Sequence, residues 1–187
     1  MAMDPRIART RTRLREALFA LARERGLDEI SISDIAERAD VNRSTFYQHY
    51  SDKDTLLADA LDAVIEETID AAEQHPITEI DGSRLLLHYL HHVHENADLY
   101  RRLFGASGSA AVQVRTTERL QQILEPYFID GVPTGLDGIP VPVAAAAVAG
   151  SALATLRAWL ALSPLPPPED AASWVLTAIL SHGRVPQ

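Results

Sequence analysis

The sequence predicts an all-α protein, with a three-helix head at the N-terminus and a body of about six further helices. The stretch from Ser31 to Lys53 has the pattern of two short helices joined by a tight turn. In the rest of the chain, apolar residues recur at helical spacing, and Gly or Pro separates the resulting segments. Each helix is considered below in chain order.

The first predicted helix runs from Arg6 to Arg25, and Gly26 ends it. One face of this helix is apolar and is formed by Leu14, Ala17, Leu18, Leu21 and Ala22. Arg9 and Arg13 stand near its start at helical spacing. We therefore expect both arginines to lie along the phosphates of bound DNA.

The next two helices form the predicted helix-turn-helix. We expect Ser33 to cap the first of them, and Asp40 to take the left-handed conformation of the turn. The second helix, about Arg43 to Tyr50, is expected to enter the major groove with its polar residues, among them Arg43, Ser44, Thr45, Tyr47 and His49.

Within that second helix, two apolar positions are left to anchor it to the core, Phe46 and Tyr50. Arg43 is the best candidate to contact a guanine, and the methyl group of Thr45 to contact a thymine. The helix therefore combines base reading with phosphate contacts.

The stretch resembles the DNA-binding end of the TetR family of bacterial transcriptional repressors. The resemblance rests on Ile35-Ala36, Ala39, Val41, Thr45-Phe46-Tyr47, His49-Tyr50, Lys53 and Leu56-Leu57. The family usually has Gly where this chain has Asp40, and a small residue where it has Ser44. The resemblance implies an effector-controlled repressor that dimerises through its last two helices. It also implies that Tyr47 and Lys53 contact the DNA backbone.

A long helix is predicted from Asp52 to about Gln74, with Lys53 in its first turn. We place the boundary between a DNA-binding domain, residues 1–52, and a ligand-binding and dimerisation domain, residues 53–187, at its start. Because this helix belongs to both parts, it is their natural mechanical link.

Three more helices are predicted over residues 83–95, 96–104 and 109–127, and we expect the first to be central and apolar on most sides. Aromatic side chains with a few polar tips predict a small-molecule site formed by Tyr89, His92, Leu103, Phe104 and Trp159. The same residues could instead fill a core. The interval 129–142 is rich in Gly and Pro and predicts a loop, a candidate lid for that site.

The apolar run from Val143 to Leu162 is long enough to span a membrane. Its alanines and Arg157 argue against insertion, so we expect a soluble helix. Small residues recur on it every four positions and allow another helix to approach closely. With the last helix, 169–182, they predict a homodimer interface formed by Ala146, Gly150, Ala154, Trp174 and Ile179. Gly150 could equally pack within one chain.

The sequence contains no GxSxG, P-loop or GxGxxG motif, and its carboxylates are scattered over predicted helix surfaces. We therefore expect no enzyme activity, no catalytic residue and no cofactor. The chain has no Cys, but His88, His91, His92 and His94 crowd one helix. A metal site there would need a further ligand, so we expect none.

The charge of the chain is unevenly distributed. Residues 1–27 contain seven Arg and three acidic residues, and residues 1–54 contain ten of each sign, so the rest of the chain carries the whole net charge of −9. This asymmetry can orient the protein on DNA. The N-terminus lacks the apolar segment of a secretory signal, so we expect a cytoplasmic protein without a membrane partner.

These observations predict a DNA-binding regulator, and the resemblance to the TetR family implies that it is a dimeric repressor. We expect a small, mostly apolar effector to release it from its operator. Its expected partners are double-stranded operator DNA, the effector and a second copy of the chain. One alternative is a nucleoid-type or structural DNA-binding protein without an effector, and an enclosed pocket in the body would argue against it. Another is an all-α metal-binding sensor, which would require the histidines to converge with another ligand.

Overall fold

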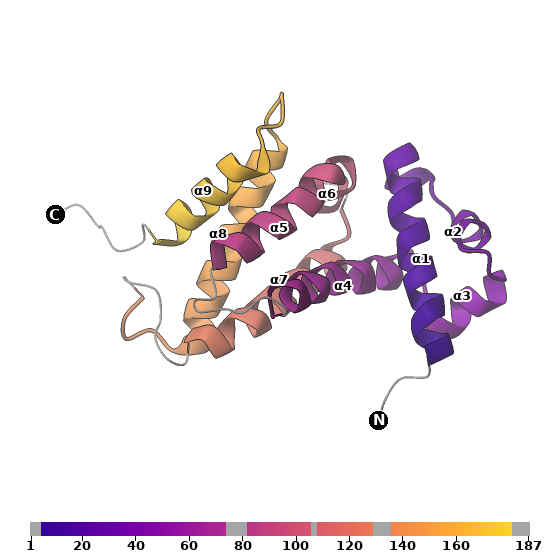
Figure 1. Cartoon of the computed structure of the whole chain (residues 1–187), viewed down its shortest axis with the longest axis horizontal. Coiled ribbons are helices and arrows are strands. Elements are labelled where there is room, and N and C mark those ends of the chain that lie inside the picture. Colours follow the sequence, from indigo (N-terminus) through magenta and orange to yellow (C-terminus); the bar gives the residue numbers. More distant parts are fainter. Residues whose placement is uncertain (1–4, 74–81, 106–107, 129–135, 181–187) are drawn as a thin grey trace.

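The computed structural model describes residues 5–73, 82–105, 108–128 and 136–180. Every regular element within these ranges is a helix, which confirms the predicted fold class. Figure 1 shows a head formed by the first helices beside a body formed by the later ones, with α4 (Lys53–Glu73) running from the head into the body. Part of the predicted loop at 129–142 lies outside the described residues.

The head consists of α1 (Pro5–Glu24), a 3-10 turn (Leu27–Glu29), α2 (Ile32–Arg38) and α3 (Arg43–His49). The predicted apolar face of α1 is buried, together with Phe19. α3 is anchored as predicted, because Phe46 and Tyr50 are both buried in the main core. This leaves the opposite side of α3 available to solvent.

Ser31, rather than Ser33, caps α2, so the predicted cap was wrong by two positions. The backbone N–H of Asp34 donates to the Ser31 hydroxyl at 3.2 Å, and the Asp34 carboxylate accepts from the Ser31 N–H at 2.8 Å. This reciprocal capping box satisfies two backbone donors. The acidic residue three positions after Ser31 decides which serine caps the helix.

The turn between α2 and α3 has the predicted left-handed residue. Asp40 has φ +53°, and the following Val41 N–H donates to the Ala36 carbonyl at 3.0 Å. Asp tolerates this conformation better than most residues with a Cβ atom. The two helices are therefore set at a sharp angle by one residue.

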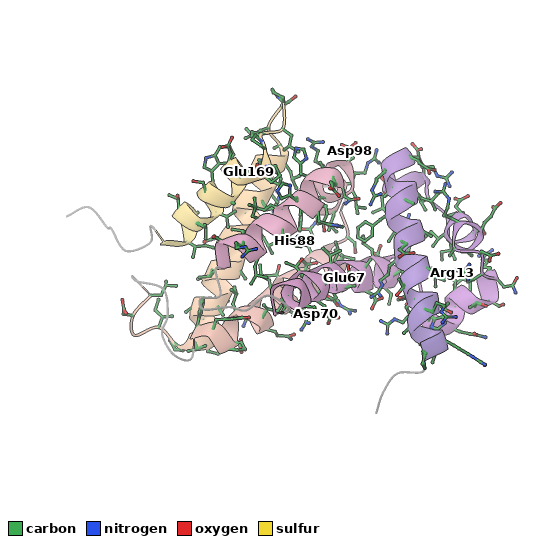
Figure 2. All side chains as sticks on the ribbon, in the orientation of Figure 1. Arg13, Glu67, Asp70, His88, Asp98 and Glu169 are labelled. Carbon is green, nitrogen blue, oxygen red and sulfur yellow. The ribbon has the colours of Figure 1, made fainter. Side chains whose placement is uncertain are left out.

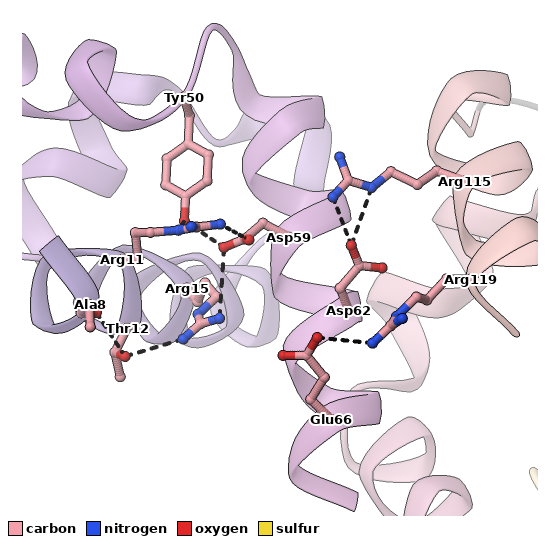
Figure 3. A network of polar contacts seen from close by, with 10 residues as sticks. All are labelled: Ala8, Arg11, Thr12, Arg15, Tyr50, Asp59, Asp62, Glu66, Arg115 and Arg119. Atoms are coloured by element: carbon pink, nitrogen blue, oxygen red, sulfur yellow. Dashed lines mark hydrogen bonds and ion pairs between the residues drawn. The ribbon is translucent and has the colours of Figure 1, made fainter. Parts of the chain in front are cut away.

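The long helix α4 (Lys53–Glu73) begins with Asp52 as its cap, since the Asp52 carboxylate accepts from the Thr55 N–H at 2.7 Å. Near its start, the carboxylate of Asp59 is bonded by Arg11 of α1 and by the Tyr50 hydroxyl, the latter at 2.6 Å (Figure 3). Arg15 lies 3.7 Å from the same carboxylate. These contacts join α1, the end of α3 and α4.

Farther along, α4 is tied to the body by two ion pairs with α7 (Ala110–Phe128). Arg115 contacts Asp62 at 2.7 Å and Arg119 contacts Glu66 at 2.9 Å (Figure 3). The helix thus has polar contacts with the head at one end and with the body along its middle. The expectation that α4 links the two parts agrees with this arrangement.

The rest of the body is formed by α5 (Gly82–Glu95), α6 (Ala97–Phe104), α8 (Val141–Leu160) and α9 (Pro168–Leu180). α8 packs against α7 and α9, and α9 packs against α5. The expectation that α5 is apolar on most sides was wrong. It buries Leu90 and Val93, but His88, His91 and His94 are exposed, so part of the helix surface faces solvent.

Helix α8 begins at Val141, two residues before the predicted start. A proline is compatible with the first turn of a helix, where its missing N–H would have no partner, so Pro142 does not delay the start. Within the described residues, α8 is long and apolar enough by composition to cross a membrane. It buries Ala144, Ala145 and Ala149 inside the body, which identifies it as a core helix of this fold.

Candidate DNA-binding face and effector site

The outer side of α3 carries the predicted DNA-contacting residues. Arg43, Ser44 and Tyr47 are exposed, whereas Thr45 and His49 are half-buried at the edge of this face. Figure 2 shows the side chains of α3 extending away from the rest of the molecule. The fold therefore presents all five predicted residues of α3 on or beside one free surface.

Arg43 and Tyr47 are already paired on this surface. An Arg43 Nη donates to the Tyr47 hydroxyl at 3.2 Å, and the guanidinium carbon lies 5.6 Å from the centre of the tyrosine ring. The spacing of four residues brings both side chains to the same side of the helix. This contact reduces the number of conformations that the Arg43 side chain can adopt.

The two arginines predicted on α1 differ in their surroundings. Arg9 is exposed and has no bonding partner among the residues that the structure describes. Arg13, labelled in Figure 2, donates to the Asp40 carboxylate in the helix-turn-helix turn at 2.9 Å. Arg9 is thus the freer of the two to reach a phosphate.

Lys53 has an intramolecular role that the sequence did not reveal. Its Nζ donates to the carbonyls of Leu27 and Ile30 at 2.7 and 3.0 Å, and the side chain is partly buried. The ammonium group therefore satisfies the backbone of the segment between α1 and α2. This geometry favours a structural role for Lys53 over the expected phosphate contact.

Three of the five predicted ligand residues gather around Tyr100, which is fully buried. The Tyr100 ring lies 5.9 Å from the His92 ring, 6.4 Å from the Tyr89 ring and 6.1 Å from the Phe104 ring. We call these four residues of α5 and α6 the aromatic cluster. His92 Nε2 is buried without a hydrogen-bond partner among the described residues.

Burial also governs the protonation of this cluster. It lowers the pKa of His92 to about 4 and raises the pKa of Tyr89 to about 12. Burial raises the pKa of Tyr100 as well. All three side chains are consequently neutral at pH 7, as an apolar site with hydrogen-bonding tips requires.

The other two predicted ligand residues lie elsewhere. Trp159 is buried, its ring nitrogen donates to the Pro166 carbonyl at 3.0 Å, and its ring stacks on His94. Leu103 is buried beside the head and lines a 260 Å³ pocket there with Lys53 and Leu57. The structure therefore does not bring all five residues to one site.

Phe104 also borders an open cleft of about 670 Å³ between α6 and the end of α8. Arg101 and Arg157 contribute charged side chains to the same cleft. A ligand that contacts Phe104 from this side could be partly polar. The cleft and the aromatic cluster are thus neighbours that share one residue.

The clustered histidines do not converge. His92 faces Phe19 and Tyr100, His94 lies on Trp159, and His91 is 3.5 Å from Glu169. Within the described ranges, no three His, Asp or Glu side chains are placed to hold a metal ion. The metal-sensor alternative has no support in this geometry.

The residues of the predicted dimer interface lie mainly on the surface. Ala146, Gly150 and Ala154 are exposed along α8, and Trp174 of α9 is 42 % exposed. Ile179 is half-buried and packs against Phe128 and its neighbours at the far end of the body. A Cβ atom built on Gly150 meets nothing within 4 Å, so this glycine is not packed within the chain.

Comparison with known proteins identifies the head. Residues 14–60 match the sequence profile of bacterial regulatory proteins of the tetR family. An uncharacterised helix-turn-helix transcriptional regulator of Bacillus subtilis, YxbF, is 39 % identical over 69 residues. That match covers 36 % of this chain and only 18 % of the Bacillus protein.

The whole fold also has close structural counterparts. A TetR transcriptional regulator from Streptococcus agalactiae matches with a TM-score of 0.62 and 25 % identity, over 93 % of this chain and 95 % of that one. The head is therefore similar to the DNA-binding end of TetR-family proteins, and the whole chain has the fold of a TetR-family regulator. Thermus thermophilus FadR, a TetR-family repressor solved with lauroyl-CoA, has the same fold, with a TM-score of 0.62, 21 % identity and coverage of 95 % and 96 %.

The residues that join head and body were missed by sequence reasoning. Arg102 of α6 lies over Gly26 and contacts the Asp28 carboxylate at 3.3 Å. Arg23 of α1 donates to the side chain of Asn96 at 2.9 Å. These partners are more than 70 residues apart, and no helical periodicity relates residues at that separation.

Proposed function

We propose that this protein is a dimeric transcriptional repressor whose affinity for operator DNA is lowered by a small, mostly apolar effector. The single observation that carries the proposal is the exposed polar face of α3. That face is held by buried Phe46 and Tyr50 in a head that matches the TetR family. We place the functional boundary between residues 1–52 and 53–187.

In the proposed complex, α3 lies in the major groove. Arg43, Ser44 and Thr45 read base edges from its N-terminal end, and Arg43 is the candidate for a guanine. Tyr47, His49 and Arg9 contact the backbone. The contact between Arg43 and Tyr47 supports these different roles for base-reading and backbone-contacting residues, because it holds the Arg43 side chain along the helix surface.

We assign the effector to the aromatic cluster of α5 and α6. Buried polar atoms are nearly always hydrogen-bonded, so the unpaired His92 Nε2 favours an apolar ligand with a donor or acceptor group. The lauroyl-CoA bound to Thermus FadR supports an effector with a large apolar part.

We propose a homodimer that pairs the exposed faces of α8 and α9. One head reads too few base pairs to select a site, whereas two heads about 34 Å apart read two half-sites. The exposed Ala146, Gly150, Ala154 and Trp174 support this interface. We further propose that the protein is cytoplasmic and has no enzyme activity, as its family is one of soluble regulators.

Selection of bound duplexes from a random DNA library tests the DNA-binding proposal. The wild-type protein should enrich an inverted repeat, and Arg43→Ala should lose about 1–3 kcal/mol of affinity and relax one base pair in each half-site. If Arg43→Ala weakens binding without changing the selected sequence, Arg43 contacts only phosphate. Failure to enrich any sequence would contradict the proposed function.

A second experiment tests the effector. A compound found by screening is titrated against free protein and against the operator complex. By linkage, it should bind free protein more tightly, by the same factor by which it weakens DNA binding, typically about 5–150-fold. Equal affinity for both forms would instead indicate a DNA-binding protein without an effector.

A further inference from the structure

The charge of Asp40 is not required by the turn in which it lies. Its φ of +53° needs a residue that tolerates the left-handed region, and both Gly and Asn meet that need without a charge. The Asp40 side chain is 91 % exposed, and among the residues that the structure describes its only bonding partner is Arg13. The carboxylate therefore has little part in holding α2 against α3.

That partner belongs to the predicted DNA-binding face. An Arg13 Nη lies 2.9 Å from Asp40 Oδ2, and the arginine side chain is 44 % exposed. An ion pair this exposed contributes little to folding. The ion pair does, however, hold the Asp40 carboxylate against the Arg13 guanidinium group, which a DNA phosphate would otherwise contact.

We propose that Asp40 competes with DNA phosphate for Arg13 and so limits the sequence-independent affinity of this protein. The inference rests on the proposed DNA-binding function. Non-specific DNA binding arises almost entirely from phosphate contacts and counterion release. When Asp40 holds Arg13, one phosphate contact is lost, so the non-specific affinity is the part of DNA affinity that falls most directly. Asp40 is thus a residue that tunes DNA affinity from outside the recognition helix.

The test is a double-mutant cycle on a short duplex of random sequence, with affinity measured across a series of salt concentrations. Asp40→Asn keeps the left-handed turn and removes the charge. It should bind more tightly and steepen the slope of log K against log salt by about 0.9, the value for one added phosphate contact. In an Arg13→Gln background, the same substitution should leave the slope unchanged.

Asp98→Asn is the matched control, because it removes an equally exposed charge that pairs with Arg101 on α6 of the body. It should leave the slope at the wild-type value. No change on Asp40→Asn, or an equal change with and without Arg13, would overturn the inference. A wild-type protein that binds no DNA would overturn the proposed function, and the inference with it.

Discussion

At the scale of single residues, His92 shows how packing changes the chemistry of a side chain. Its ring lies edge-on to Phe19 of the head at 5.1 Å and to Tyr100 of the body at 5.9 Å. Burial disfavours the imidazolium form and lowers its pKa from 6.5 to about 4. His92 is therefore a neutral, uncharged contact between α1 and α5 at physiological pH.

This predicts a loss of stability in mild acid. In the unfolded chain His92 takes up a proton as the pH falls below 6.5, but in the folded protein only near pH 4. Between these values the unfolded state binds more protons, so the free energy of unfolding falls as the pH falls. His92→Phe should reduce this decline in urea unfolding at pH 7 and pH 5.

The exposed His94 on the same helix provides the matched comparison. His94→Gln should keep the acid sensitivity of the wild-type protein, because its ring is not enclosed between head and body. If His92→Phe and wild-type lost stability in parallel between the two pH values, His92 would not be the group responsible.

At the scale of helices, two cations hold the segment between α1 and α2 against the body. Lys53, at the start of α4, bonds the carbonyls of Leu27 and Ile30, and Arg102 of α6 contacts Asp28. A shift of α4 or α6 would therefore displace this segment and with it the head. The contacts give the proposed effector response a physical route, in addition to α4 itself.

Lys53→Met should accordingly destabilise the protein. The substitution removes two charge-assisted hydrogen bonds and leaves two carbonyls without that partner, so the free energy of unfolding should fall by about 1–3 kcal/mol. Urea denaturation measures this loss. Arg9→Met is the contrasting variant: it should keep the wild-type stability but flatten the salt dependence of DNA binding by about 0.9.

The opposite result for Lys53→Met would support the phosphate contact that the sequence predicts for Lys53. A Lys53→Met protein of wild-type stability with a flattened salt slope would show that its ammonium group serves DNA and not the head. Because stability and salt slope are measured separately, the two roles are distinguishable.

At the scale of the whole molecule, α8 has two different sides. One side is buried against α7 and α9, while the other exposes Ala146, Gly150 and Ala154. Small residues in a row allow a second helix to approach closely. The exposed Trp174 of α9 lies on the other helix of this pair and adds apolar area for a partner.

Gly150→Leu should therefore weaken the proposed dimer without unfolding the chain. The new side chain meets no atom of its own protomer within 4 Å at Cβ, and leucine favours a helix more than glycine does. Sedimentation at a series of concentrations should show more monomer than wild-type. Val114→Leu, at an exposed position of α7, should sediment like wild-type.

A Gly150→Leu protein with unchanged dimer affinity would move the interface away from the middle of α8. A loss of folded protein would be visible in the unfolding curve, and would show instead that the glycine is required within one chain. The combination of sedimentation and unfolding separates these outcomes.

Much of the fold could be predicted because it depends on local patterns. Helical spacing of apolar residues located the helices, and the turn residue Asp40 and the anchors Phe46 and Tyr50 were identified from the helix-turn-helix alone. Errors arose where neighbouring signals compete. Ser31 and Ser33 both offer a hydroxyl group at the start of α2, and the reciprocal bond with Asp34 selects Ser31 as the cap.

The candidate effector site could be predicted only in part. Aromatic residues near one another in sequence, such as Tyr89 and His92, do gather in space, but Tyr100 at their centre was not anticipated. Trp159 and Leu103 have the residue types expected in the same ligand site, but packing places both side chains away from the aromatic cluster. Composition identifies aromatic side chains but not the direction in which each one points.

The sequence by itself determined the helical class, the helix-turn-helix and the polar face of α3, because each depends on residues within a few turns of one another. The tertiary structure alone decided the contacts of Lys53, Arg13 and Arg102. A long basic side chain can reach a phosphate, a carboxylate or a backbone carbonyl with similar ease. Which of these it meets depends on segments distant in sequence, and only folding brings those segments together.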